Sequence, residues 1–300
     1  MPQYITLAEM ANRKSVEGAI AEQLDKISPL LSFLTFEKKP GGIKKYGVRE
    51  TLPTMAFRGA NEAITPDTSI INPYEEACAI IENNPWIDKA VVSGSPEDAM
   101  AMEMVANLQA LSQTFGNAFY YGDRQANAKE LDGLYSRILA AGSQFVDGSG
   151  TGSDLTSIYV VNFGLGDVQG VMPEDEEPIQ AKFIGEHLHS TLNIMGYLGH
   201  VYAKMGIAVC NPFAVCQYGN IESAGSSNVV DLDKLDEAIL SVKGSGQTIA
   251  LMNKTAFRYF NKVARASVTR YSDELGRFYY DYAGVPIYID ENIVNTETAK

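Results

Sequence analysis

The last quarter of the chain decides the fold. It reads TIALMNKTAFRYFNKVARA over residues 248–266 and RFYYDYAGVPIYIDENI over residues 277–293. The apolar run from Thr248 to Met252 has the length of a short buried strand. Asn253 and Thr255 follow it, and both residue types can cap the start of a helix. The apolar residues of that expected helix are Ala256, Phe257, Phe260 and Val263.

Two aromatic strands are expected after this helix. They span Phe278 to Tyr282 and Val285 to Asp290, and they meet at the turn signal Ala283-Gly284. A buried strand, a helix and a strand pair therefore follow one another, which indicates a fold of mixed α+β class.

The composition is that of a folded chain. Of the 300 residues, 45% are hydrophobic and 20% are charged, which is ordinary for a globular protein. The mean hydropathy is −0.11 and the sequence has no apolar run of 18 residues, so no membrane span is expected. The net charge of −13 argues against tight binding of nucleic acid, which needs clusters of lysine and arginine. Weak and non-specific contact with DNA remains compatible with it.

A long helix is expected after Ser95. Ser95 suits the N-cap, Pro96 suits the first helical position, and Glu97 and Asp98 favour the positive end of the helix dipole. An apolar face then recurs at steps of three and four residues, which indicates core packing. Its members are Met100, Met104, Leu108, Leu111, Phe115 and Phe119.

The first thirty residues have a helical pattern, and a strand is expected after them. Val16, Ile20, Leu24 and Ile27 recur at helical spacing, and Pro29 ends that pattern. The apolar run from Leu30 to Phe36 is typical of a strand.

Two further strands are expected beyond the turn at residues 40–42. Ile43 to Glu50 and Pro53 to Arg58 flank Thr51 and Leu52, and they contain few large apolar residues. A two-stranded ribbon on its own is marginally stable in water. The segment is therefore either an arm that lies on a neighbouring molecule or a plain surface hairpin.

No catalytic or cofactor site is expected. The glycines of GSGTG at residues 148–152 are not followed by a lysine, and an apolar strand follows them instead of preceding them. The glycines at 164, 166 and 170 do not match the dinucleotide fingerprint, because no helix follows them.

No metal site is expected either. Cys210 and Cys216 are too far apart for the usual zinc-binding pair, and with Cys78 they are interpreted as free packing residues. His187 and His189 would lie on one side of a strand, with His200 as a third candidate. No acidic cluster completes such a site, so surface or interface histidines are expected.

Several passages of the chain resemble the major capsid proteins of tailed bacteriophages, in the order in which that family has them. The likeness covers nearly the whole chain and is greatest to the short-tailed group that includes epsilon-fifteen. The sequence departs from the family over Gly206 to Ile221, where relatives tend to have tryptophan and arginine. The passages that carry the resemblance are LPTMAFRGANE (52–62), NAFYYGD (117–123), LDGL (131–134), DLTSIY (154–159) and GVPI (284–287).

The resemblance implies the Hong Kong-type (HK) capsid fold, in which the helix after Ser95 is the spine of a peripheral domain. The implied parts are an amino-terminal arm at 1–40, an extended loop at 41–72, a peripheral domain at 73–130 and 248–300, and an axial domain at 131–247.

The resemblance also implies a structural protein and not an enzyme. Such a protein assembles in the host bacterial cytoplasm into pentamers and hexamers of an icosahedral head that encloses double-stranded DNA, and it remains in the virion. Its implied partners are other copies of itself, a portal protein, and scaffold and decoration proteins where these exist. In the extended loop, the charges expected to pair between subunits are Arg49, Glu50, Arg58 and Glu62.

Two alternatives stand beside this interpretation. One is an encapsulin-type nanocompartment shell, which shares the fold but encloses a cargo enzyme. The other is a soluble α+β enzyme whose site is built from scattered residues.

Overall fold

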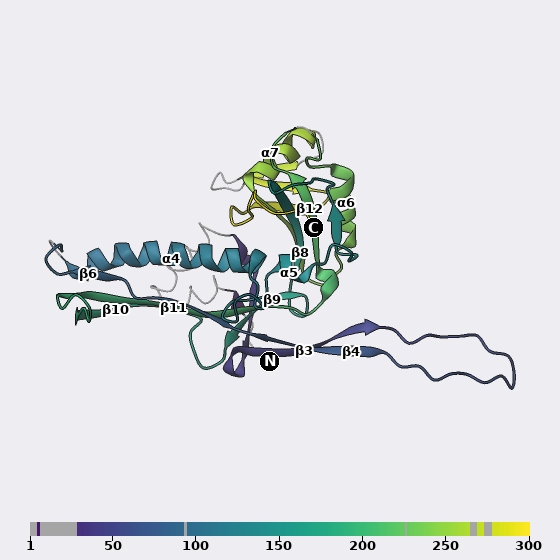
Figure 1. Ribbon diagram of the computed structural model, residues 1–300, viewed down its shortest axis with the longest axis horizontal. Helices are drawn as coiled ribbons and strands as arrows, with labels where there is room; N and C mark the ends of the chain where they lie inside the picture. Colours follow the sequence, from purple (N-terminus) through teal and green to yellow (C-terminus); the bar gives the residue numbers. More distant parts are fainter. Residues whose placement is uncertain (1–4, 7–28, 93–94, 226, 265–268, 273–277) are drawn as a thin grey trace.

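The computed structural model describes residues 5–6, 29–92, 95–225, 227–264, 269–272 and 278–300. The helix predicted from Val16 to Ile27 lies outside these residues. The described chain has an elongated half around helix α4, a compact half that carries helices α6 and α7, and a long two-stranded arm that projects from the region where the halves meet (Figure 1).

The elongated half is built on α4 (Pro96–Tyr121), and it confirms the helix predicted after Ser95. The Ser95 side chain accepts a hydrogen bond from the Asp98 backbone N–H at 3.5 Å, which caps the helix as expected. The apolar face of α4 packs over a sheet in which the long strand β11 pairs with three others. These strands are β11 (Met195–Val209), β10 (Ile179–Leu188), β5 (Ala79–Asn83) and β6 (Trp86–Asp88).

The compact half contains a mixed sheet whose central strand β8 (Leu155–Phe163) is buried along its whole length. Successive side chains of a strand point to opposite faces. Tyr159 and Val161 therefore pack into the core shared with α4, whereas Ile158 and Val160 pack beneath α6 and α7. The other strands in this half are β7 (Phe145–Asp147), β12 (Val215–Glu222), β13 (Gln247–Met252), β14 (Thr269–Ser272), β15 (Phe278–Tyr282) and β16 (Val285–Ile289).

A side chain caps the start of each of the two helices of the compact half, and α7 starts where the sequence predicts. Asp231 accepts a hydrogen bond from the Asp233 N–H and caps α6 (Leu232–Ser241). Asn253 accepts one from the Ala256 N–H and caps α7 (Lys254–Val263). Both helices bury their apolar sides against the same cluster of core residues, so their polar sides face outward.

Strand β9 (Val168–Pro173) joins the two halves, because it pairs with β11 on one side and continues the sheet of β8. Strand β2 (Thr35–Lys39) pairs parallel to β9 and carries β1 (Ile5–Thr6) on its other edge. The remaining short helices are α3 (Leu30–Phe33), η1 (Pro40–Gly42), α5 (Leu134–Arg137) and η2 (Pro212–Ala214).

Strand pairing connects segments that the prediction assigns to different domains. Strand β13 pairs with β8, which the prediction places in the other domain, and on its other side it pairs with β16. Conversely, β10 and β11 lie against α4. The cause is long-range pairing, which local sequence signals do not encode. The exact domain boundaries stay a prediction.

Two expected strands are wrong in detail. The run from Leu30 to Phe36 begins with the helical turn α3, and the strand starts only at Thr35. Residues 53–58 are not a strand, and the chain returns along β4 (Ile70–Ala77) instead. A strand at 53–58 would need a tight turn at Thr51-Leu52, where neither residue favours a positive φ, and Pro53 has no N–H for the ladder.

The turn between β15 and β16 confirms the prediction at Ala283-Gly284. Tyr282 pairs directly with Val285, so the connection between the two strands consists of Ala283 and Gly284 alone. Both have positive φ, 52° for Ala283 and 78° for Gly284, as a two-residue hairpin turn of type I′ requires. Asp281 Oδ1 accepts a hydrogen bond from the Gly284 N–H at 3.0 Å.

Changing Ala283 to asparagine is expected to raise the free energy of unfolding by about 0.5–1 kcal/mol, because asparagine tolerates positive φ better than alanine. The matched variant Ala283→Val should lower it, because a β-branched side chain is strained there. Chemical denaturation of the unassembled chain measures both. A loss of stability in Ala283→Asn would contradict the positive φ at this residue.

Candidate assembly surface

The arm is the most exposed part of the described chain. Strands β3 (Ile43–Thr51) and β4 pair antiparallel, and residues 52–69 connect them without regular structure. Figure 1 shows that this connection lies far from both halves. Phe57 is fully exposed and Met55 is 90% exposed. Apolar side chains held in water at the end of a projecting element mark a surface for association.

The FRGANE motif forms a closed turn at the tip of the arm. Arg58 Nη1 donates a hydrogen bond to the Glu62 carbonyl oxygen at 3.0 Å, and the Gly59 N–H donates to Glu62 Oε2 at 2.6 Å. Asn61 has a φ of 66°, which asparagine tolerates. The motif thus orders the backbone beside Phe57 while the aromatic ring remains in solvent.

A second clip ties the two sides of the tip together. Asp67 accepts hydrogen bonds from the Thr54 N–H at 2.7 Å and from the Thr68 N–H at 2.9 Å. The bond from Thr54 is the main cause that lowers the pKa of Asp67. The carboxylate is therefore ionised at neutral pH and holds residues 54 and 67 side by side.

Two of the four charged residues predicted to pair between subunits make contacts within the arm itself. Arg58 and Glu62 lie together, but their contacts close the turn of a single chain. Arg49 is exposed near the outer end of β3, and among the described residues it makes no hydrogen bond or ion pair with Arg58 or Glu62. Glu50 lies in β3, and its side chain is outside the described part of the structure. Pairing of these four residues between subunits stays a prediction.

The root of the arm is fixed to the body by a buried network around Glu76. Tyr46 stacks on Tyr74 across the two strands, with ring centroids 5.8 Å apart. The Tyr46 hydroxyl donates to Glu76 Oε1 at 3.1 Å, and Arg137 Nη1 of α5 contacts the same oxygen at 2.6 Å. Burial and the Glu76 carboxylate raise the pKa of Tyr46, so its hydroxyl stays a donor.

A second ionic contact holds the root to β2 and β9. Lys44 Nζ lies 2.7 Å from Glu37 Oε2, and Gln169 Nε2 donates to the same oxygen at 2.7 Å. Burial alone would raise the pKa of Glu37, but the hydrogen bonds from Lys44, Lys39 and Gln169 lower it to about 2. The arm thus has a rigid root and an apolar tip.

A groove of about 430 Å³ lies beside the root, between the arm and the segment around α5. We call it the root groove. Its outer wall carries Leu139 and Phe213, which are 71% and 49% exposed. Arg137 and Gln144 also line the groove, and their Nη2 and Oε1 atoms are buried and have no hydrogen-bond partner among the described residues.

Another exposed apolar surface lies at the far end of the elongated half. It includes the end of β10, the start of β11 and the turn that joins them. This end is not among the surfaces predicted from the sequence, although the run LHSTLNIM at 188–195 places apolar residues in a turn. Its exposed members are Phe183, Ile184, Leu188, Leu192, Ile194 and Met195.

The histidines hold local structure or lie on the surface. His189 Nδ1 accepts hydrogen bonds from the backbone N–H groups of Thr191 and Leu192. His200 Nε2 lies 3.0 Å from Glu82 Oε1. The described residues include no group of three or more side chains placed to bind a metal ion.

The cysteines are free thiols with weak reactivity. Burial raises the pKa of Cys78 to about 11 and that of Cys216 to about 12, and it also raises the pKa of Cys210. A thiol with a raised pKa is a poor nucleophile at neutral pH. Within the described part of the chain, no helix combines the length and apolar character needed to cross a membrane.

Comparisons with known proteins identify a family and a fold. The model of the family described as "Major capsid protein GP7" matches residues 12–300. A chain in the structure of bacteriophage Epsilon15 is 16% identical, with a TM-score of 0.64 over 88% of this chain and 87% of that one. That likeness shows the fold. No curated protein matches.

Two further structural matches have lower scores. The capsid of bacteriophage JBD30 is 11% identical, with a TM-score of 0.48 over 86% of this chain and 88% of that one. The SrpI encapsulin complex of Synechococcus elongatus PCC 7942 is also 11% identical, with a TM-score of 0.47 over 65% of this chain and 89% of that one.

Proposed function

The chain belongs to the GP7 family of major capsid proteins, and from this we propose that its copies form the pentamers and hexamers of an icosahedral bacteriophage head around double-stranded DNA. The family is one of structural proteins and not of enzymes, and its members are components of the virion. The observation that carries the proposal is the arm, which has an ordered, fully exposed apolar tip on a fixed root.

The arm is proposed to lie on a neighbouring copy. A ribbon of two strands gains little stability in water on its own, and burial of Met55 and Phe57 on a second copy would remove their apolar surface from solvent. The tip and the surface that receives the tip of a neighbouring copy are different surfaces of the same chain. Contacts of this kind join copies head to tail and close into rings when the rotation permits.

The charges of the arm are proposed to align it on the neighbour. Arg49, Glu50, Arg58 and Glu62 lie along its outer part. Single exposed ion pairs contribute only about 0–1 kcal/mol each, so their effect depends on repetition around the shell.

Changing Arg58 to glutamate is expected to weaken or block shell assembly while the chain stays folded. The variant loses the bond to the Glu62 carbonyl and places a second carboxylate in the same turn. Arg124→Glu makes the same charge change in an exposed loop after α4 and should assemble normally. Electron microscopy and size-exclusion chromatography give the yield of shells, and circular dichroism reports the fold. Normal shells from Arg58→Glu would count against a role for the arm charges.

The other partners follow from the same proposal. Copies would assemble in the host bacterial cytoplasm, with a portal protein at one position and with scaffold or decoration proteins where the phage encodes them. The net charge of −13 supports weak contact with the enclosed DNA. The encapsulin alternative is the weaker one, because the matching family is that of major capsid proteins.

Electron microscopy of the protein expressed alone, and then with its neighbouring genes, tests the function. Uniform hollow shells in either experiment would support it, and portal genes beside this one would favour a phage over an encapsulin. A stable monomer in both experiments would overturn the proposal.

A further inference from the structure

The outward side of α7 carries a row of positive charges. Lys254, Arg258 and Lys262 are all exposed and are spaced four residues apart, so they lie on one side of the helix. Like charges at this spacing destabilise a helix. The three positive charges therefore lower the stability of α7 itself. They also stand out in a chain whose net charge is −13.

The outward side of α6 carries the opposite charge. Asp233 and Glu237 are exposed and four residues apart, and Leu240 on the next turn is 78% exposed. Likewise, the last residue of α7, Val263, is an exposed apolar residue beside the charged row of that helix. The two helices thus present complementary surfaces, each with charges and one apolar side chain.

The positive residues of α7 and the acidic residues of α6 do not form ion pairs with each other within the described part of one chain. Lys254 lies 3.4 Å from Glu291, but both side chains are well exposed, and Arg258 lies over the ring of Tyr259. Among the residues that the structure describes, no ion pair engages Arg258, Lys262, Asp233 or Glu237. Figure 1 shows α7 at the top of the compact half and α6 along its side.

We propose that α7 of one copy packs against α6 of the next copy around each ring, with Arg258 paired to Glu237. This inference rests on the proposed function, because it requires copies arranged in rings. A ring needs two different and mutually complementary surfaces on every copy, and these two helices provide them. Arg258 is the middle charge of its row, so it meets Glu237 whether the helices run parallel or antiparallel.

Charge complementarity also favours protein over nucleic acid as the occupant of the α7 row. A DNA site would account for the three positive charges and would leave the acidic side of α6 without a role. Three contacts to phosphate would also give only weak, salt-sensitive binding. Complementary charges across a protein interface set its register and exclude wrong partners.

Charge reversal and its compensation test the pairing. Arg258→Glu and Glu237→Arg should each lower the yield of shells by about tenfold, because like charges then face each other across the contact. The double variant should recover most of the yield, since the pair is restored with its signs exchanged. Lys129→Glu, an equal charge change at an exposed loop residue, should assemble normally.

A crosslinking experiment covers the case in which a reversed variant folds poorly. Chains with Glu237→Cys and chains with Arg258→Cys are co-expressed and oxidised after assembly. A disulfide-linked dimer that forms in the mixture, and not with either variant alone, is expected. The native cysteines at 78, 210 and 216 are present in all samples and serve as the background.

The outcomes separate the pairing from the proposed function. If the unaltered chain forms no shells with its neighbouring genes, the proposed function fails. If it forms shells and Arg258→Glu does too, or if the double variant shows no recovery, or if no mixed dimer appears, the pairing is overturned. Normal shells of Arg258→Glu that retain less DNA would assign the α7 row to nucleic acid and would also overturn it.

Discussion

Changing Phe57 to aspartate is expected to leave the chain folded and to prevent it from forming closed shells. The ring is fully exposed at the tip of the arm and contributes nothing to the core of its own chain. Substitutions at such sites usually change the free energy of unfolding by less than about 0.5 kcal/mol. A carboxylate buried in an apolar contact on the neighbour would cost at least a few kcal/mol. That cost recurs at every copy in the shell.

The measurement compares Phe57→Asp with Phe57→Leu under identical expression. Leucine keeps an apolar side chain of similar reach, so that variant should retain shells at a reduced yield. Sedimentation through a gradient separates shells from free chain, and thermal unfolding of the free chain checks the fold. Shells in normal yield from Phe57→Asp would show that the tip is not buried in the assembly.

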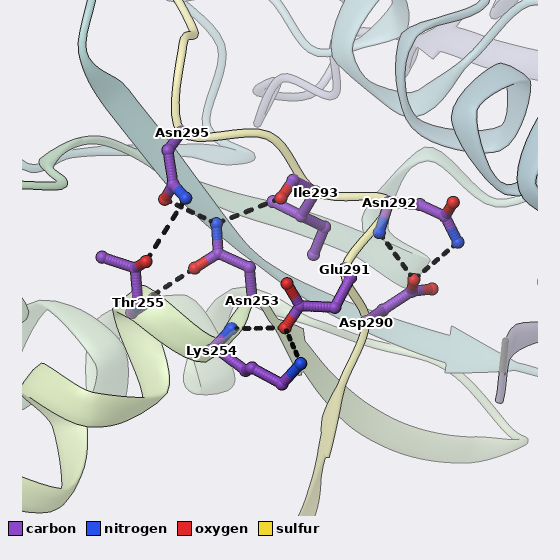
Figure 2. Close-up of polar contacts among 9 residues, drawn as sticks. Asn253, Lys254, Thr255, Asp290, Glu291, Asn292, Ile293 and Asn295 are labelled. Atoms are coloured by element: carbon purple, nitrogen blue, oxygen red, sulfur yellow. Dashed lines mark hydrogen bonds and ion pairs between the residues drawn. The ribbon is translucent and has the colours of Figure 1, made fainter. Parts of the chain in front are cut away.

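Changing Asn253 to alanine is expected to lower the free energy of unfolding by about 3–5 kcal/mol. Its side chain is almost fully buried, and Figure 2 shows that it links the start of α7 to the chain after β16. Oδ1 accepts from the Ala256 N–H at 2.9 Å. Nδ2 lies within hydrogen-bond distance of Thr156 Oγ1 at 2.8 Å, the Ile293 carbonyl at 3.1 Å and Asn295 Oδ1 at 2.8 Å. Alanine removes the cap and leaves the buried oxygens of Thr156 and Ile293 without this donor.

Two variants separate the contributions at this position. Asn253→Ser retains a cap for α7 but no amide donor, so its loss should be intermediate. Asn261→Ala, on the same helix, should change the free energy of unfolding by less than about 0.5 kcal/mol. Urea denaturation of the free chain gives all three values. A stability of Asn253→Ser equal to that of the unaltered chain would show that the amide donor contributes little.

The features that the sequence predicts correctly are local ones. The start of α4 depends on Ser95 and Pro96, the start of α7 on Asn253, and the last turn on Ala283 and Gly284. Each of these signals acts over a few residues, through a cap or a backbone preference. The family resemblance also rests on short passages, and the matching family and fold confirm it.

The features that the sequence missed depend on pairing over long distances. The returning strand of the arm lies at 70–77 because it matches the register of β3, and no local signal marks it as the partner. Strand β13 pairs with β8 and β11 lies against α4, and in each case the partners are far apart in the sequence. The predicted charge Glu62 accepts a backbone hydrogen bond inside the tip, which only the folded turn makes visible.

The exposed tip of the arm also has a consequence for the free chain in the cell. Each unassembled copy holds Met55 and Phe57 in water, so the same side chains that would build the shell favour association with any apolar surface. Association by such contacts obeys mass action. Free chain should therefore accumulate only up to a threshold concentration, above which additional synthesis adds to particles and not to the soluble pool.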